Sequence, residues 1–347
     1  MKDTTIYRML FCIKKPLISL LAVVTFLPIV SAQDPVFSQY YNSPIQLNPA
    51  LAGNNYAPLF AINYRTQWRG IDRAYNTFAV SYDQFFSNSN SGIGMSLLTD
   101  AAGDGALKHT KANFTYSYRM KVKGETYLRG AIQVGFLQRT LNWDKFVFGD
   151  GINPQFGSTS PGGARYPTSE IQPDNLSKSL FDVGAGFILY DRNYFFGISL
   201  DNLTKPEDIF LRNIENNYVG IPPRINVHGG YRFNIGNVKY NGQGSYMIPS
   251  FLFSRQGDFN QFHFGSQFVF NELLLSGSFR FANVIGDAVI LAAGYQVRNT
   301  KIMYSFDFTV SKLNINGGGA HEIGIVINLE DYFPKESKYN DCLQLFR

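Results

Sequence analysis

The chain has 347 residues, a formal charge of +5, 16% aromatic residues, 16% charged residues and a mean hydropathy of −0.12. Charged residues make up about a quarter of an ordinary soluble domain, so this composition is unusual for one. After residue 32 no apolar run approaches the roughly 20 residues of a membrane-spanning helix, which excludes a helical membrane protein.

Residues 1–32 have the features of a secretory signal peptide. Four basic residues lie around the start of the chain, a mostly apolar run extends from Leu17 to Val30, and the small residues Ser31 and Ala32 follow. We therefore expect export and cleavage after Ala32. The segment carries a net +3 of the formal +5, which leaves +2, so no nucleic-acid partner is expected. Only Cys342 then remains, which excludes an internal disulfide or a cysteine metal site.

Residues 33–57 form a lead-in segment that differs from the rest of the chain. It contains three prolines together with Asn48 and Gly53. Proline lacks a backbone donor, and Asn and Gly favour turns, so neither a long helix nor a long strand is expected here. Two roles are compatible with this pattern: a compact segment that packs in the mouth or lumen of the protein, or a segment that faces a partner.

Strict alternation governs the region 58–333. Over residues 111–120 every even-numbered residue is apolar or aromatic and every odd-numbered residue is polar. The same two-residue period, with a few exceptions, recurs over 77–83, 261–270 and 302–311. Because successive side chains of a strand point to opposite faces, each segment predicts a strand with one apolar and one polar face.

Fourteen such strands can be placed, with 12 to 16 compatible with the pattern. A soluble sandwich would carry many Lys and Glu residues on its polar face, whereas Asn, Gln, Ser, Thr and Gly dominate here, as expected of a lumen. The sequence therefore predicts an all-β, antiparallel transmembrane barrel with short turns at one end and long loops at the other. The expected strands are 58–68, 76–86, 92–99, 107–121, 125–140, 180–191, 194–201, 224–235, 238–254, 260–271, 273–283, 288–298, 301–312 and 321–330.

Six charged residues lie within these otherwise apolar strands. A basic residue that faced lipid near the midplane would cost about 2–4 kcal/mol, and an acidic one less. They are therefore expected to face the lumen and to pair there with opposite charges. The six are Arg65, Arg119, Arg129, Asp83, Asp182 and Asp307.

The last expected strand resembles the closing-strand signal that barrel-assembly machinery reads. Its polar residue is Glu322, its glycine is Gly324, and Ile327 and Leu329 are its spaced apolar residues. A polar tail, 334–347, follows the barrel, whereas many barrels stop at a terminal aromatic residue. The expected organisation is thus a signal peptide (1–32), a lead-in segment (33–57), a barrel (58–333) and a tail segment (334–347).

Catalytic and metal-binding patterns are weak. The four histidines lie on separate expected strands and have no metal-type spacing, and no Gly-x-Ser-x-Gly motif is present. His109 and His263 fall on polar faces and are expected in the lumen or at its rim. We expect no enzymatic activity, no metal and no cofactor.

The lead-in segment resembles the opening of the PorP/SprF family of the type IX secretion system, which reads approximately DPxFSQY…P…NPAxAG. The following Tyr64-Arg65-x-Gln67-Trp68 is similar to the family's first hairpin. The residues of the lead-in motif that match are Phe37, Ser38, Gln39, Tyr40, Asn48, Pro49, Ala50 and Gly53.

The resemblance implies an outer-membrane protein of Bacteroidota that supports secretion or surface attachment of a large adhesin, of the kind used in gliding, or of a protease. It also implies specific partners: the C-terminal domain of a secreted type IX cargo, and components of the translocon or of the periplasmic ring and motor, besides membrane lipid. The long loops Leu141–Ser179 and Asn202–Pro223 are expected to carry recognition, because loops on a rigid scaffold bind partners. The alternative is a passive, porin-like diffusion channel, which the polar inner face would also suit.

Overall fold

The computed structural model describes residues 34–70, 74–206, 220–235, 245–283, 285–310, 318–330, 343 and 346. The signal peptide expected at 1–32, the middle of the loop Asn202–Pro223 and most of the tail segment lie outside these residues. In the described part of the chain, no helix is long and apolar enough to cross a membrane.

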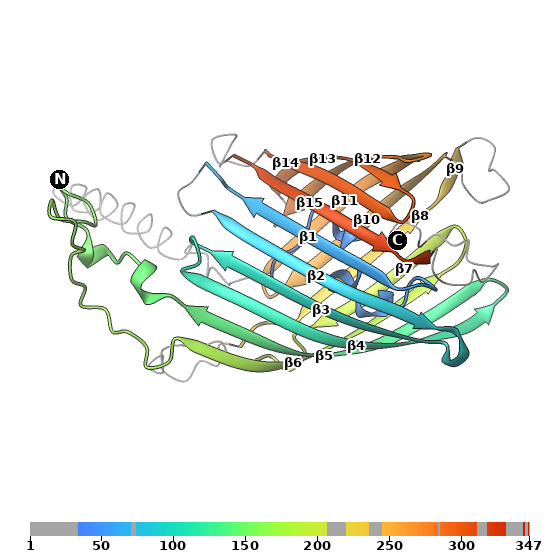
Figure 1. The fold of residues 1–347 in the computed structure, drawn as a ribbon, viewed down its shortest axis with the longest axis horizontal. Coiled ribbons are helices and arrows are strands. Elements are labelled where there is room, and N and C mark those ends of the chain that lie inside the picture. The colour runs from blue at the N-terminus through green and yellow to red at the C-terminus, as the bar shows by residue number, and fades with distance from the viewer. Residues whose placement is uncertain are drawn as a thin grey trace, which may run out of the picture. The chain divides into compact units, whose positions relative to one another are not determined.

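The described residues form one closed antiparallel barrel of fourteen strands, as the alternation predicted (Figure 1). Each strand pairs with its neighbours in sequence, and β15 pairs with β1 to close the barrel. The elements β8 and β9 lie end to end against β10 and together make one of the fourteen. The strands are β1 (Leu59–Gln67), β2 (Tyr75–Phe86), β3 (Ser91–Ala102), β4 (Leu107–Lys123), β5 (Thr126–Leu141), β6 (Ser177–Tyr190), β7 (Tyr194–Asp201), β8 (Arg224–Tyr231), β9 (Phe233–Ile235), β10 (Ser245–Gln256), β11 (Phe259–Phe270), β12 (Leu273–Ala282), β13 (Ile285–Val297), β14 (Thr300–Thr309) and β15 (Ala320–Asn328).

The two faces of the wall differ as the sequence predicted. In β4, Phe114 and Tyr116 are 43% and 44% exposed on the outer face, whereas Thr115 and Ser117 are fully buried on the inner face. An outer band of aromatic and aliphatic side chains around a polar interior is the pattern of a membrane-spanning barrel. Five of the six strand charges are buried toward the lumen, and Arg119 lies half-buried on the inner side of β4.

The two ends of the barrel also differ. At one end, the long-loop end, the connections 68–74, 142–176, 202–223 and 310–319 join strands. At the other, the short-turn end, four of the six connections span two or three residues each (124–125, 191–193, 271–272 and 298–299), and the other two are 87–90 and 236–244. The long-loop end also has three short turns, 103–106, 257–258 and 283–284. The barrel begins at Leu59 and ends at Asn328, both at the short-turn end.

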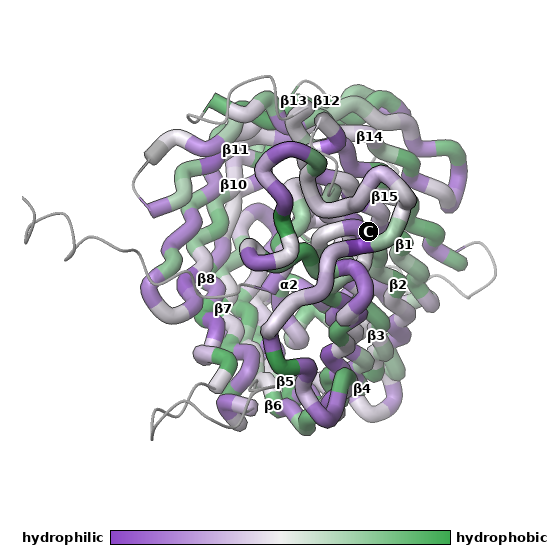
Figure 2. The backbone as a smooth tube through the Cα atoms, turned by 90° about the vertical axis from the view of Figure 1, so that its left-hand side faces the viewer, coloured by the Kyte–Doolittle hydropathy of each residue, from purple (hydrophilic) through white to green (hydrophobic). Residues whose placement is uncertain are grey.

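The lead-in segment lies inside the barrel. It contains three short helices, η1 (Tyr40–Asn42), α2 (Pro44–Leu47) and η2 (Pro49–Leu51), and most of its residues are buried. Seen along the barrel, α2 lies within the ring of strands (Figure 2). The remaining short helices are η3 (Ser87–Ser89) in a turn, and η4 (Trp143–Lys145) and η5 (Gly149–Gly151) in the longest loop.

Candidate functional site

The lead-in segment is held where the barrel closes. Glu322 of β15 is fully buried, and its carboxylate accepts the backbone N–H groups of Ser38 and Gln39, each at 2.9 Å. Glu322 lies between Arg65 of β1 and Ser305 of β14 in the register of the three strands. Glu322, the polar residue of the closing-strand pattern, thus binds the lead-in segment.

Ser38 is the centre of a buried ionic network. Its hydroxyl donates to Asp307 at 2.7 Å and accepts from Arg65 at 2.6 Å and from Arg280 at 3.0 Å. Arg65 also pairs with Asp307 at 2.9 Å and with Glu322 at 3.1 Å, and Arg280 pairs with Asp307 at 2.8 Å. We call Ser38, Arg65, Arg280, Asp307 and Glu322 the seam cluster. Buried charges require such pairing because desolvation is costly.

Gln39 and Tyr40 extend these contacts to other strands. The Gln39 amide donates to Ser305 Oγ at 2.9 Å and to the carbonyl of Glu322 at 3.1 Å. Gly324 makes this close approach possible, since a Cβ there would lie 2.8 Å from Gln39 Oε1. The Tyr40 hydroxyl lies 2.8 Å from Ser250 Oγ on the other side of the lumen.

Asn48 holds the middle of the lead-in segment. Its Oδ1 accepts the N–H of Ala50 at 2.9 Å and so caps η2. Its Nδ2 donates to His228 Nε2 at 3.0 Å and to the carbonyls of Phe187 and Ile198 at 3.1 and 3.3 Å. One amide therefore shapes the lead-in segment and attaches it to three neighbouring strands.

The end of the motif contacts a third sector of the wall. Pro49 and Ala50 are buried in η2. The carbonyl of Ala52 accepts from Ser117 at 2.7 Å and from Arg129 at 3.3 Å, and the N–H of Gly53 donates to Asp83 at 2.8 Å. The segment is thus bound around the whole inner circumference.

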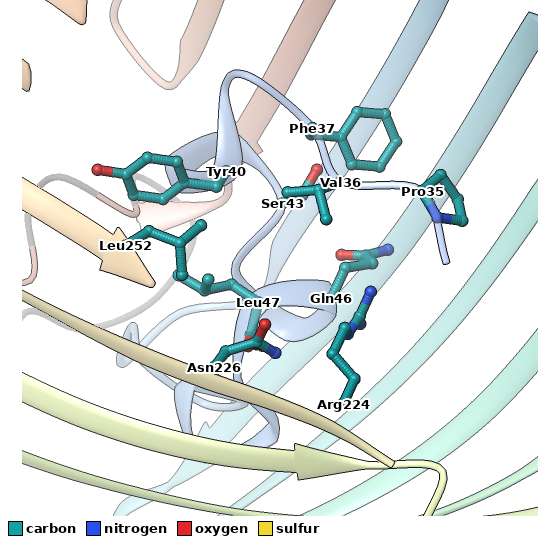
Figure 3. A pocket seen from close by; sticks show the side chains of 10 residues that line it. All are labelled: Pro35, Val36, Phe37, Tyr40, Ser43, Gln46, Leu47, Arg224, Asn226 and Leu252. Carbon is teal, nitrogen blue, oxygen red and sulfur yellow. Dashed lines mark hydrogen bonds between the residues drawn. The ribbon is translucent and has the colours of Figure 1, made fainter. Parts of the chain in front are cut away.

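Phe37 borders a small cavity between the lead-in segment and the strands β8 and β10. Gln46 lies between Ser43 and Arg224 on its wall (Figure 3). The cavity measures about 20 Å³, which is room for about one water molecule. The Ser43 hydroxyl and the Gln46 amide have no protein partner among the described residues and suit such a water. The cavity is too small for an organic ligand.

The apolar residues of the closing strand have a different role from Glu322 and Gly324. Ile327 pairs with Phe60 and Thr300 on the face that also presents Ile323, which is 45% exposed. The N–H of Leu329 donates to the carbonyl of Pro58 at 3.0 Å. Their assignment to an assembly signal stays a prediction.

Two residues of the tail segment, Leu343 and Phe346, lie in the lumen. Leu343 and Phe346 are fully buried, and the Phe346 ring lies 5.3 Å from Phe195 and 6.3 Å from His228. The carbonyl of Leu343 accepts from Asn54 Nδ2 at 3.4 Å. The sequence analysis did not predict these contacts; the available signal was the apolar residues Leu343, Leu345 and Phe346, which follow the polar residues 334–341.

The longest loop, which is 142–176 in the structure and was expected at Leu141–Ser179, is ordered by its own side chains. Trp143 and Phe148 pack with ring centroids 4.8 Å apart, and a hollow of about 160 Å³ adjoins them. The Asp150 carboxylate accepts from the backbone N–H of Ser169 at 2.6 Å and from the hydroxyls of Thr168 and Ser169, each at 2.8 Å. The backbone bond from Ser169 and these hydroxyl bonds lower the pKa of Asp150 to about 2.

Three histidines, His109, His228 and His263, are buried on the inner side of the wall. His321 instead lies on the outer side, where its Nδ1 is 2.7 Å from the Tyr304 hydroxyl. Among the described residues, no group of three or more His, Cys, Asp or Glu side chains could hold a metal ion.

Solved structures of two other bacterial proteins resemble this chain over most of its length. The toluene transporter TbuX of Ralstonia pickettii matches at 11% identity, covering 82% of this chain and 92% of its own, with a TM-score of 0.48. The outer-membrane protein Omp33 of Acinetobacter baumannii matches at 9% identity, covering 80% of this chain and 99% of its own, with a TM-score of 0.41. No curated protein matches the sequence.

The family comparison covers most of the chain. The family described as "Type IX secretion system membrane protein PorP/SprF" matches residues 29–327, a range that includes the lead-in segment and all but the last residue of β15. A closed barrel with an apolar outer band belongs in an outer membrane. The chain is therefore an outer-membrane member of the PorP/SprF family of the type IX secretion system.

Proposed function

We propose that this protein is a non-enzymatic docking barrel, which binds the C-terminal domain of a cognate secreted protein and holds it at the cell surface. Adhesins of the gliding type and secreted proteases are the cargo classes that family membership suggests. In outer-membrane barrels the longer loops face outward, so the long-loop end is the side that would meet the cargo. Contacts with other type IX components would then fall to the short-turn end.

The observation that carries this proposal is the filled lumen. Asp34 is bonded to Gln256 and Asn202 at the long-loop end, and the lead-in segment then runs through the barrel to Pro58 at the short-turn end. Its motif is attached to wall strands on every side. A passive channel needs an open path for solutes, so the packing favours a scaffold over the porin-like alternative.

The longest loop offers the cargo a surface. Ile152, Phe156 and Ile171 are 49%, 54% and 79% exposed, although apolar side chains of this size are usually covered. The Asp150 hydrogen bonds and a salt bridge from Lys145 to Asp104 of the neighbouring loop hold the backbone beneath them. A prearranged surface binds with a smaller entropic cost than a loop that must first be ordered.

Capture of a purified cargo C-terminal domain by the detergent-solubilised barrel tests the proposal. We expect the double variant Phe156→Ser/Ile171→Ser to retain less than a tenth of the captured cargo. The control is Val122→Ser, because Val122 is 59% exposed on β4 near the short-turn end. If all three proteins captured the same amount of cargo, the longest loop would not be the cargo-binding surface. If the wild-type protein captured none, the proposed function would be wrong.

Planar-bilayer recording separates the docking barrel from the porin-like alternative. We expect no steady conductance from the wild-type protein at neutral pH. A steady open level that responds to solute size would instead establish a diffusion channel. This measurement needs no knowledge of the cargo.

A further inference from the structure

Two residues of the tail segment lie in the barrel as a bound peptide would. Leu343 and Phe346 are fully buried, three positions apart, and belong to one apolar cluster with residues of the wall and of the lead-in segment. The cluster includes Tyr190 and Phe195 from the short-turn ends of β6 and β7. These two side chains therefore occupy an apolar site near the short-turn end of β6 and β7, which we call the pocket.

The pocket has both apolar and polar recognition features. The Phe346 ring meets Phe195 edge to face at an interplanar angle of 76°, a favoured aromatic geometry. Asn54 Nδ2 donates to the carbonyl of Leu343, which is a main-chain contact that any residue at that position could make. Two side-chain positions and one backbone bond are the features by which a groove reads a short peptide.

The same pocket is connected to the lead-in segment. Phe346 lies against His228, and the Nε2 of His228 accepts from the Asn48 amide. Asn48 in turn caps η2 and bonds to the carbonyls of Phe187 and Ile198. Occupation of the pocket therefore supports the hydrogen bonds that hold the centre of the lead-in segment.

The chain between the barrel and the pocket is polar. Residues 334–341 read Pro-Lys-Glu-Ser-Lys-Tyr-Asn-Asp, with four charged side chains among eight residues. Such a composition has little apolar surface to bury, which makes it suited to tether a ligand and poorly suited to form core. The apolar anchors are concentrated in the few residues that follow.

We propose that this pocket is a peptide-binding site at the short-turn end, which Leu343 and Phe346 of the protein's own chain occupy as an intramolecular ligand. The partner it fits is a peptide with leucine and phenylalanine three residues apart, presented from the periplasmic side. A tether of this length gives an effective concentration in about the millimolar range, so the tail excludes a dilute competitor. A partner peptide binds when the tail is withdrawn, and the support beneath His228 is then supplied by the partner. The inference does not depend on cargo binding at the long-loop end.

The test uses a fluorescein-labelled synthetic peptide of residues 335–347 with serine in place of Cys342. Fluorescence anisotropy compares its binding to the intact chain and to a chain that ends at Cys342. We expect saturable binding to the shortened chain at micromolar peptide and at least about tenfold less binding to the intact chain. A peptide with serine at both Leu343 and Phe346 should not bind to either protein.

A second protein keeps the test decisive if the shortened chain does not fold. A protease site inserted between Glu336 and Tyr339 allows the tail to be cut after the barrel has formed. A cut tail that leaves and is replaced by the labelled peptide supports the proposal. A folded barrel that refuses the peptide, or a cut tail that never exchanges, overturns it and makes the tail a permanent part of the fold.

Discussion

Arg65 and Glu322 lie directly opposite each other on β1 and β15, with Arg65 Nη1 3.1 Å from the Glu322 carboxylate. The first and last strands of the barrel are thus joined by a buried ion pair as well as by their backbone hydrogen bonds. Ser38 Oγ bonds to Arg65 while its backbone N–H bonds to Glu322, so the lead-in segment depends on the same pair.

Replacement Glu322→Ala should weaken closure of the barrel strongly. It leaves the Arg65 guanidinium in a buried site with one acid fewer and deprives two backbone donors of their acceptor. Removing one partner of a buried ion pair costs about 3–5 kcal/mol. We expect the heat-modifiable band of the folded barrel on gels to be largely lost, whereas Glu272→Ala, in an exposed turn, should leave it unchanged. Equal band intensities in both variants would contradict the role of the seam cluster.

Replacement Asn48→Ala should loosen the lead-in segment without opening the wall. The variant loses the cap of η2 and three hydrogen bonds to the strands, and a lost cap alone costs about 0.5–2 kcal/mol. We expect a folded barrel with transient conductance steps in planar bilayers. The control is Asn153→Ala, which removes an equivalent turn bond in the exposed loop. Silent recordings from Asn48→Ala would show that the segment stays in place without this amide.

Replacement Gly186→Ala should be costly although the side chain is small. The added Cβ would lie 2.1 Å from Asn48 Oδ1, so Asn48 has to move and break its contacts. Overpacking of this kind costs about 1–3 kcal/mol in urea-induced unfolding. At Gly149 no atom lies within 4 Å of the added Cβ, and Gly149→Ala should change the unfolding free energy by less than about 0.5 kcal/mol. If Gly186→Ala and Gly149→Ala unfolded at the same urea concentration, the close approach of Asn48 to β6 would be refuted.

The longest loop should respond to acid through Asp150. Its pKa is lowered to about 2, so its hydrogen bonds stabilise the loop above the ordinary value of 3.8 and are lost as the pH falls toward 2. Trp143 fluorescence, recorded in a Trp68→Phe background, should therefore change with a midpoint near pH 2. In Asp150→Asn this transition should be absent, because the amide does not titrate. A wild-type midpoint near pH 4 would mean that the Ser169 and Thr168 bonds do not hold the carboxylate.

The wall could be predicted well from the sequence, because a membrane barrel obeys one simple rule. Lipid outside and packed polar groups inside impose the same alternation on every strand, which is why fourteen strands were found. The expected strand 224–235 is divided by the structure into β8 and β9, because its pairing with β10 stops at Gly230 and resumes at Phe233 in the same register. The pattern of apolar and polar residues over 224–235 does not reveal this break.

The interior was predictable only in part. Alternation placed Arg65, Asp307 and Glu322 on strands, and burial cost oriented the first two inward. It could not show that Ser38 lies among them, because its contacts with Asp307 and Glu322 join residues 269 and 284 positions apart. The sequence also could not show that Gly324 leaves room for the Gln39 side chain, because a glycine in a strand can have several other structural reasons. The tail contacts at Leu343 and Phe346 depend on the pocket that the rest of the chain builds.

The path of the lead-in segment restricts the order in which this protein can be made. Asp34 lies at the long-loop end and Pro58 at the short-turn end, and the sheet surrounds everything between them. If β15 met β1 first, some two dozen residues would have to be drawn through a tube already lined with side chains. We therefore expect the sheet to curl around a segment that is already in place, and the seam between β1 and β15, which Ser38 and Gln39 touch, to close last. The lead-in segment is thus the internal core around which the last strand, β15, pairs with the first strand, β1.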